Sequence, residues 1–248
     1  MSYAIRFVFA AAAVCVLAVY PSAQTPTQGK PTDTIPASGG NIGIQPINHA
    51  TLQITHGDHV IDVDPVAQGN YANLVAPDII LITDIHGDHL DLATIAKLKK
   101  ANTKIVAPAA AKIEGAIVIG NGETKTVDGV SIEAVPMYNL TRGPAAGQFF
   151  HDKGRGNGYI VTLGGKRIYI AGDTECTPEV KALKNIDVAF VPMNLPYTMP
   201  PSEAAECVKA FKPAIVYPYH YRGSNLDEFA SALKGTGIDV RIRDWYVK

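Results

Sequence analysis

The pattern of apolar and polar positions divides the 248-residue chain into two parts. Short segments that alternate or are wholly apolar dominate the first two-thirds, and this is typical of β-strands. In the last third, apolar strands alternate with segments that have helical spacing. We expect the early strands at residues 42–47, 51–55, 59–63, 79–82, 103–107, 116–119, 125–127 and 130–136. This order predicts an α/β protein, and two similar β-α layers packed face to face would fit it.

The stretch from Pro77 to Asp91 combines a strand, a turn and the start of a helix. Its apolar run Ile79–Ile82 predicts a strand buried on both faces. Apolar residues at helical spacing follow within 90–100. The turn between them holds Asp84, His86, Asp88 and His89. Ligands of open α/β sheets bind where such strands end, and imidazole with carboxylate suits divalent transition metals. The tight spacing therefore suggests a centre of two metal ions.

A second copy of the tetrad His-Gly-Asp-His lies at residues 56–59. It falls between two alternating runs, and Gly57-Asp58 suits a two-residue hairpin turn. Neither a buried strand nor a helix flanks this copy, and Ile54 stands where a further ligand would be needed. We therefore interpret His56 and His59 as exposed hairpin residues outside the site.

Three further strand ends carry a histidine or an aspartate. His151 lies on a glycine-rich loop before a strand, Asp173 follows a strand in Gly-Asp-Thr, and His220 ends the strand that begins at Ala214. Each has a simpler explanation when it is taken alone, such as a helix cap in the case of Asp173. Taken together in this order, they favour one shared metal site.

These motifs resemble those of the metallo-β-lactamase superfamily, whose signature is His-x-His-x-Asp-His after a buried strand. Asp84 stands here in place of the first histidine. The Gly-Asp-Thr-Glu turn at 172–175 and the short C-terminus are most similar to the ascorbate-6-phosphate lactonase-like and N-acylphosphatidylethanolamine phospholipase D-like branch. The resemblance covers about residues 42–248 and implies a four-layer αββα sandwich.

The resemblance also implies two divalent metal ions, zinc or manganese, with iron as a further option. The implied ligands are Asp84, His86 and His151 for the first site and Asp88, His89 and His220 for the second, with Asp173 shared. Asp64 would brace the metal loops from behind, although an aspartate before proline can also simply start a turn. Because Asp84 adds a third carboxylate, we expect its site to favour manganese or iron over zinc.

The implied activity is hydrolysis of a small-molecule ester, lactone or phosphodiester by a hydroxide that both metals activate. Asp88 would take part in catalysis, and Asn194 or Tyr197 could stabilise the oxyanion. His49 and Arg222 could bind the substrate, with a structural histidine and loop packing as equal alternatives. A periplasmic β-lactamase and a non-catalytic metal- or ligand-binding protein on the same fold stay open. The chain lacks Gly-x-Ser-x-Gly, which argues against a serine hydrolase.

Composition and the N-terminus bear on location and partners. Residues 1–23 predict a cleaved signal peptide, 24–40 a flexible leader and 41–248 a single domain, which implies a secreted or periplasmic protein without a stable membrane span after cleavage. The net charge of −1 and dispersed Lys and Arg exclude an extended nucleic-acid interface. Cys176 and Cys207 could form a disulfide or be separate core residues. Self-association is left open.

Overall fold

The computed structural model describes Met1 and residues 32–246. Its first sheet has seven strands in chain order. They are β1 (Asp33–Ala37), β2 (Gly40–Asn48), β3 (Thr51–His56), β4 (His59–Val63), β5 (Ile79–Leu81), β6 (Lys104–Ala107) and β7 (Ile117–Val118). Helix α1 (Leu92–Leu98) joins β5 to β6, and a 3₁₀ turn, η1 (Ala109–Ala111), joins β6 to β7. The Asp91 side chain accepts hydrogen bonds from the backbone N–H groups of Ala93 and Thr94, which fixes where α1 begins.

The second sheet also has seven strands. They are β8 (Thr124–Val127), β9 (Val130–Met137), β10 (Gly156–Leu163), β11 (Lys166–Ile170), β12 (Val188–Pro192), β13 (Ile215–Tyr219) and β14 (Asp239–Val240). Helices α2 (Pro178–Lys181), α3 (Pro201–Phe211) and α4 (Leu226–Ala232) connect β11 through β14. Each lies between two neighbouring parallel strands, as parallel pairing requires.

The two sheets repeat one topology. In each, the first four strands pair antiparallel and the remaining three continue in parallel. This agrees with the two similar layers expected from the sequence. Because the parallel strands of both sheets end in loops, each half supplies a set of loops on which side chains can converge.

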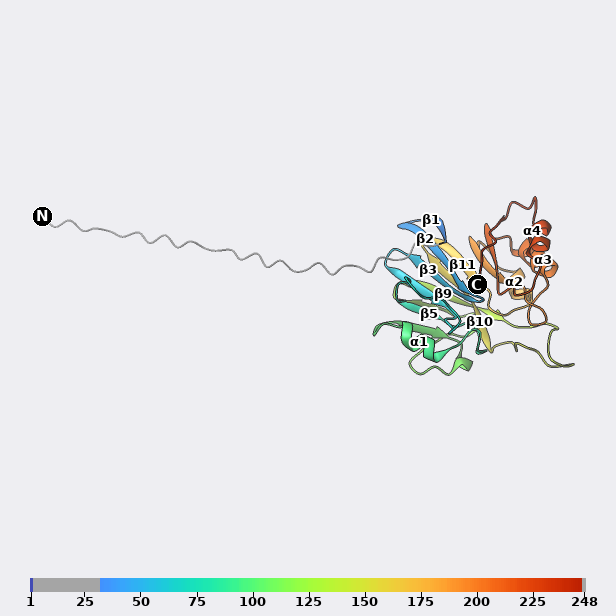
Figure 1. Cartoon of the computed structure of the whole chain (residues 1–248), viewed down its shortest axis with the longest axis horizontal. Helices are drawn as coiled ribbons and strands as arrows, with labels where there is room; N and C mark the ends of the chain where they lie inside the picture. Colours follow the sequence, from blue (N-terminus) through green and yellow to red (C-terminus); the bar gives the residue numbers. More distant parts are fainter. Residues whose placement is uncertain (2–31, 247–248) are drawn as a thin grey trace.

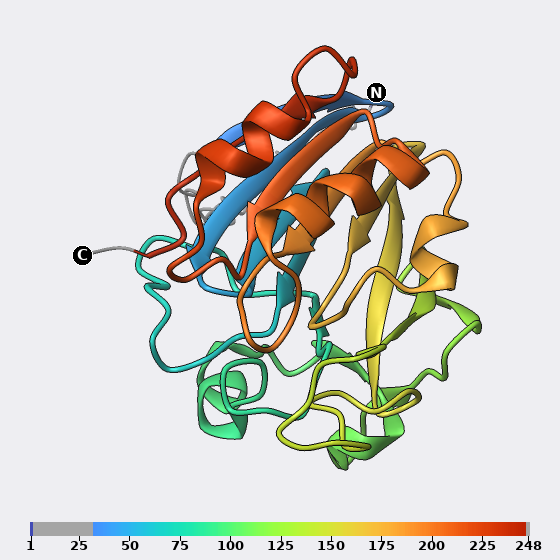
Figure 2. The same cartoon turned by 90° about the vertical axis from the view of Figure 1, so that its right-hand side faces the viewer.

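Three apolar cores hold together four layers: helix α1, the first sheet, the second sheet, and helices α2–α4. The largest lies between the sheets and includes Ile44, Leu81, Tyr159 and Phe190. A second core packs the outer face of the second sheet against α2, α3 and α4, and a smaller one packs β5 and β6 against α1. Figure 1 shows α2–α4 gathered beside the second sheet and away from α1, and Figure 2 shows α3 and α4 in front of that sheet. The fold is thus the αββα sandwich of the metallo-β-lactamase fold.

The ordered domain begins earlier than the sequence predicted. Residues 33–37, placed in the flexible leader by their composition, form the edge strand β1 and pair antiparallel with β2. Ile35 is buried in the central core, and Asp33 forms an ion pair with Arg243. Pro36 is tolerated because β1 is an edge strand. The expected signal peptide and the leader up to residue 31 lie outside the described residues.

None of the helices in the described residues is long and apolar enough to cross a membrane. The longest, α3, has 11 residues, and its buried positions face the second sheet.

Candidate metal centre

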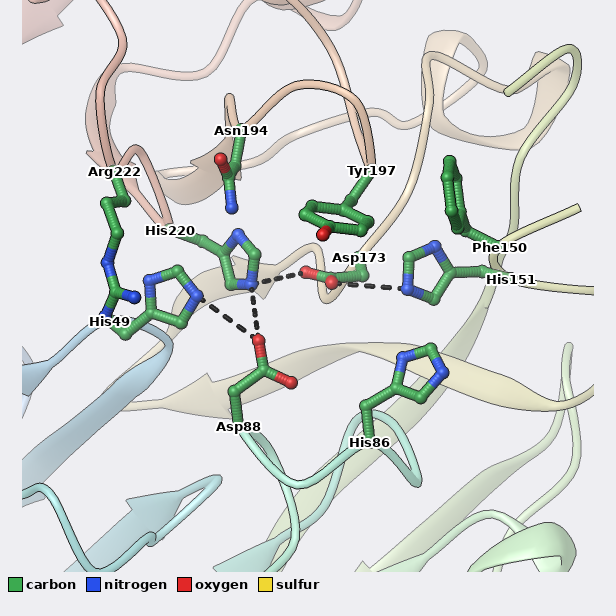
Figure 3. A pocket seen from close by; sticks show the side chains of 10 residues that line it. All are labelled: His49, His86, Asp88, Phe150, His151, Asp173, Asn194, Tyr197, His220 and Arg222. Carbon is green, nitrogen blue, oxygen red and sulfur yellow. Dashed lines mark ion pairs between the residues drawn. The ribbon is translucent and has the colours of Figure 1, made fainter. Parts of the chain in front are cut away.

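The histidine and aspartate side chains meet at one edge of the sandwich, beyond the ends of strands from both sheets (Figure 3). His86, Asp88 and His89 follow β5 of the first sheet. Asp173 follows β11 and His220 follows β13 of the second. Since the carboxyl ends of parallel strands lie at the same edge of a sheet, this arrangement follows from the topology.

The carboxylate of Asp173 is the centre of the cluster. Its Oδ1 lies 3.2 Å from Nε2 of His220, and its Oδ2 lies 3.3 Å from Nε2 of His151. His89 adds a third imidazole, with Nε2 3.4 Å from the same Oδ2. The carboxylate of Asp173 thus faces His220 through one oxygen and both His151 and His89 through the other.

The buried polar atoms here suit a cation. His89 Nε2, His220 Nε2 and Asp173 Oδ1 are fully buried and make no hydrogen bond of regular geometry with any described residue, although the two imidazole nitrogens lie 3.2–3.4 Å from the Asp173 carboxylate. Leaving such atoms without a partner costs about 1–3 kcal/mol each, which a bound cation would offset. Two donors roughly 2.1 Å from one ion in tetrahedral geometry lie about 3.4 Å apart, close to the spacings observed around Asp173. The donor set thus fits a divalent metal ion.

Two more groups of potential ligands flank Asp173. Asp84, His86 and His151 form one, with Nδ1 of His86 2.8 Å from Oδ2 of Asp84. Asp88 forms the other with His49 and His220, whose Nε2 atoms lie 3.3 and 3.5 Å from its Oδ2. The Asp88 side chain is 49% exposed and borders the open cavity, whereas Asp84 is fully buried.

His89 is held by hydrogen bonds behind it. Its Nδ1–H donates to Oδ2 of Asp64 over 2.8 Å, which leaves Nε2 free to act as a ligand. Asp64 in turn accepts from the backbone N–H and the hydroxyl of Thr83, one residue before Asp84. Asp64 therefore contacts the metal loop from behind without facing the cavity.

His151 is oriented by Asn139. Nδ1–H and the backbone N–H of His151 both donate to Asn139 Oδ1, each over 2.8 Å. The Asn139 amide donates to Glu175 Oε1, and Glu175 also accepts from the backbone N–H groups of Thr141 and Arg142. This network fixes the tautomer that presents Nε2 of His151 to the site.

A disulfide joins Cys176, next to Glu175, to Cys207 of α3, with the Cα atoms 5.5 Å apart. Of the two alternatives for these cysteines, the structure has the bridge. It ties the loop that follows Asp173 to the helix covering the second sheet.

The backbone of the site is unusual. His49, Asp64 and His220 all adopt the left-handed region, with φ values of 53°, 45° and 48°. Such residues persist only where the surroundings fix them, and they cluster at functional sites. Gly172 also has a positive φ of 66°, and a Cβ there would lie 2.5 Å from Sδ of Met137, so a side chain at this position would be strained and would displace Met137.

Charges in the cluster stabilise one another. Burial would raise the pKa of Asp173, but the imidazoles of His220 and His89 hold it well below its usual value. Burial would lower the pKa of His89, yet the carboxylates of Asp173 and Asp64 raise it well above the ordinary value. For Asp84, burial is outweighed by the hydrogen bond from His86 and by nearby positive charge, so its pKa falls to about 2. Asp173 and Asp84 thus favour the anionic form that binds a cation, whereas burial raises the pKa of Asp64.

A cavity of about 570 Å³ opens above these side chains. Asn194 and Tyr197 line the wall across from His86 and Asp88 in Figure 3. Arg222 and His49 lie at one end of the view, and Phe150 lies at the other. The Nδ1 of His49 is 2.6 Å from the hydroxyl of Tyr246, which braces this imidazole.

The structure brings together all the residues that the sequence suggested as metal ligands, and the expected catalytic and substrate-binding residues line the same cavity. The tetrad at 56–59 lines a different cavity between β-hairpin turns, as expected, but His56 and His59 are half-buried there and not exposed, because neighbouring hairpins pack against them. Sequence reasoning missed Asn139, Glu175 and Tyr246, and it missed Arg155, whose guanidinium donates to the Asp84 carboxylate. Only Glu175 had a signal, as the last residue of Gly-Asp-Thr-Glu.

Comparison with known proteins agrees with the fold and the site. The beta-lactamase superfamily domain matches residues 43–220, so the chain belongs to this superfamily. The UPF0173 metal-dependent hydrolase of Pyrococcus abyssi is 36% identical over an alignment of 193 residues, which covers 71% of this chain and 82% of that protein. The comparisons do not distinguish the lactonase-like branch within the superfamily.

Solved structures give the same picture. A protein of Parabacteroides distasonis assigned as a metal-dependent hydrolase is 45% identical, has a TM-score of 0.81, and covers 87% of this chain and 98% of its own. Igni18, a metallo hydrolase of Ignicoccus hospitalis, matches with a TM-score of 0.69 over 83% of this chain and 96% of its own. At 21% identity, Igni18 shows the shared fold alone.

Proposed function

We propose that the protein is a hydrolase that binds two divalent metal ions and cleaves an ester, lactone or phosphodiester bond in a small molecule. The observation that carries this proposal is the convergence of His89, Asp173 and His220 with unpartnered buried atoms, next to a second group of ligands. The names of the relatives, metal-dependent hydrolases, support the reaction class.

The residues present would hold the metals in two neighbouring groups. Asp84, His86 and His151 would make up one, and Asp88, His89 and His220 would make up the other, with Asp173 shared. Bound there, divalent ions supply Lewis acidity and lower the pKa of a water molecule enough for it to act as a nucleophile near neutral pH.

Side chains of the cavity would take up the remaining tasks. Asp88, with one carboxylate oxygen toward the open cavity in Figure 3, can accept a hydrogen bond from the attacking water and fix its direction. The Asn194 amide and the Tyr197 hydroxyl, on the opposite wall, can donate to the oxygen on which negative charge develops.

The two ends of the cavity differ in chemistry and suggest a substrate with two unlike parts. Arg222 has its guanidinium 5.4 Å from the ring centre of Tyr246 and makes no ion pair within the described residues. At the other end, the rings of Phe150 and Tyr197 meet edge to face at 5.0 Å. A neighbouring groove shares Phe150 and continues to Leu195, whose side chain is 53% exposed. This supports a substrate with an anionic group at Arg222 and an apolar group near Phe150.

Metal analysis followed by a substrate screen tests the proposal. After remetallation, we expect two ions per chain and hydrolysis of at least one of four classes: lactones, esters, phosphodiesters and β-lactams. Less than one ion per chain would refute the dinuclear centre. Cleavage of nitrocefin alone would favour a β-lactamase, and full metal content without any turnover would favour a binding protein.

Two variants test the substrate orientation. In Arg222→Gln, KM should rise about tenfold for a carboxylate-bearing substrate and stay unchanged for its neutral analogue. In Leu195→Ser, kcat/KM should increase less with the length of the substrate's acyl chain than in wild type, because an apolar contact is lost. Val118→Ser, at an exposed apolar residue of β7, is the control.

We also propose that the protein acts in a secreted or periplasmic location. The disulfide supports this, since such bonds persist mainly in oxidising compartments. Cell fractionation of the full-length chain, against a form lacking residues 2–23, tests the proposal. Equal recovery of both forms in the cytoplasm would contradict it.

A further inference from the structure

Arg155 contacts the one ligand that departs from the family signature. Its Nε and Nη2 donate to Oδ1 of Asp84 over 3.2 and 3.1 Å, and Nη2 also lies 3.1 Å from Oδ2. The remaining side of the carboxylate faces the other ligands, because Oδ2 is 2.8 Å from Nδ1 of His86 and 3.9 Å from Nε2 of His151. Asp84 is fully buried and Arg155 is 17% exposed, so the pair is largely shielded from solvent.

The backbone fixes this contact. Asn157, at the start of β10, donates its N–H to the carbonyl oxygen of Thr83 over 2.9 Å. Gly156 permits the close approach, since a Cβ there would lie 2.7 Å from that same oxygen. Asp84 directly follows Thr83, and Arg155 directly precedes Gly156, so the two strand ends place the guanidinium beside the carboxylate.

Charge explains why the arginine matters. A neutral histidine at this position would add no charge to the centre, whereas Asp84 adds one negative charge. A buried carboxylate needs a compensating partner, and the planar guanidinium fork suits one well. Among the arginine and lysine side chains of the described residues, that of Arg155 forms the ion pair with Asp84. Together the two side chains carry no net charge, as a neutral imidazole would.

We propose that Arg155 is a positioning residue of the metal centre, which cancels the charge of Asp84 and turns its Oδ2 toward His86 and His151. The Asp84–Arg155 pair then replaces the first histidine of the signature as one neutral unit. This inference rests on the proposed metal centre. It reverses the expectation from the sequence that Asp84 alone shifts the first site from zinc toward manganese or iron.

A double-mutant cycle tests the pairing. Four proteins are needed: wild type, Arg155→Gln, Asp84→His, and the double variant. After remetallation, zinc and manganese affinities are measured by competition with a chelator. In the wild-type background, Arg155→Gln should lower the affinity for the more loosely bound ion about 10- to 100-fold. It should also shift the relative affinity for the two metals from zinc toward manganese. In the Asp84→His background, the same change should have no effect or should strengthen binding, because a cation there only repels the metal.

Two further variants separate charge from folding. Arg155→Lys keeps the charge without the fork, so it should keep the wild-type zinc preference with lower affinity. Arg167→Gln removes an arginine that pairs with Glu133 on the second sheet, and it should leave metal binding unchanged. Circular dichroism and thermal melting of every variant report on folding.

The outcomes distinguish the inference from the function on which it rests. If Arg155→Gln weakened binding equally in both backgrounds, Arg155 would be a structural residue only. If it raised the number of bound ions, the guanidinium would be competing with the metal. Either result overturns the inference while the hydrolase stands. A wild type that binds less than one ion overturns both.

Discussion

The chain contains the tetrad His-Gly-Asp-His twice, and the two copies have entirely different surroundings. Residues 56–59 form the turn of the β3–β4 hairpin, where His56 and His59 are cross-strand partners. Residues 86–89 follow β5 and face Asp173, His151 and His220 from the second sheet. The same four residue types thus give a hairpin turn with half-buried histidines in one place and a candidate metal centre in the other.

The difference lies in what stands behind and across from each histidine. His89 donates to the buried Asp64 and lies 3.4 Å from Asp173, whereas the side-chain hydrogen bond of His56 among the described residues is to the carbonyl oxygen of Ser38. A ligand needs partners from other segments to fix its tautomer and direction. The comparison teaches that the tetrad acquires chemistry only through contacts distant in sequence.

The largest effect is expected from His89→Ala, in the copy that faces Asp173. It removes a proposed ligand and leaves the Asp64 carboxylate buried without its imidazole. Metal affinity and activity should fall by more than the roughly 100-fold that is typical for supporting residues. Metal content after dialysis and kcat/KM measure the loss. Retention of both ions would show that His89 is not a ligand.

A smaller effect is expected from Asp64→Asn, which keeps the shape but removes the charge that holds Nδ1–H of His89. Metal affinity should fall about 10- to 100-fold. Asp62→Asn, two residues earlier on β4, is the matched control, because its partner is the Gln53 amide and not a histidine. Equal losses in both variants would mean that β4 is merely sensitive to substitution.

Asp62→Asn also carries a prediction of its own. Burial raises the pKa of Asp62 to about 7, although the hydrogen bond from Gln53 opposes this. Because the folded state binds this proton more tightly than the unfolded state, the protonated carboxyl contributes to the free energy of unfolding. That contribution is lost as pH rises from about 4 to about 7. In Asp62→Asn, the free energy of unfolding should therefore depend less on pH over this range. Denaturant titrations at several pH values measure it, and an unchanged slope would contradict the shift.

The smallest effect is expected from alanine at both His56 and His59. Metal content and kcat/KM should match those of wild type, and stability should change by no more than about 0.5–1 kcal/mol. A loss comparable with that of His89→Ala would show that the wrong copy had been chosen.

Residues whose placement depends on neighbouring sequence were predictable. The run Ile79–Ile82, the turn and the following helix identified the second tetrad, and strand ends identified Asp173 and His220. By contrast, β1 was missed because its segment is poor in apolar residues and owes its order to pairing with β2.

The supporting residues could not be predicted for a related reason. Arg155 lies 71 positions from Asp84, and Glu175 lies 36 from Asn139. No periodicity joins residues so far apart, and the register of β10 against the first metal loop is visible only in three dimensions. The same holds for the left-handed backbone at His49 and His220.

The candidate ligands come from both sheets, and this has a thermodynamic consequence. An ion held by loops of the two halves would act as a non-covalent cross-link between them. A ligand that binds only the folded state adds RT ln(1 + [L]/Kd) to its stability, about 2.7 kcal/mol at 100 times Kd. Removal of metal should therefore lower Tm, and hydrogen exchange should increase first in the loops after β5 and β13. The amount of free metal available to the protein would then set how firmly its two halves stay together.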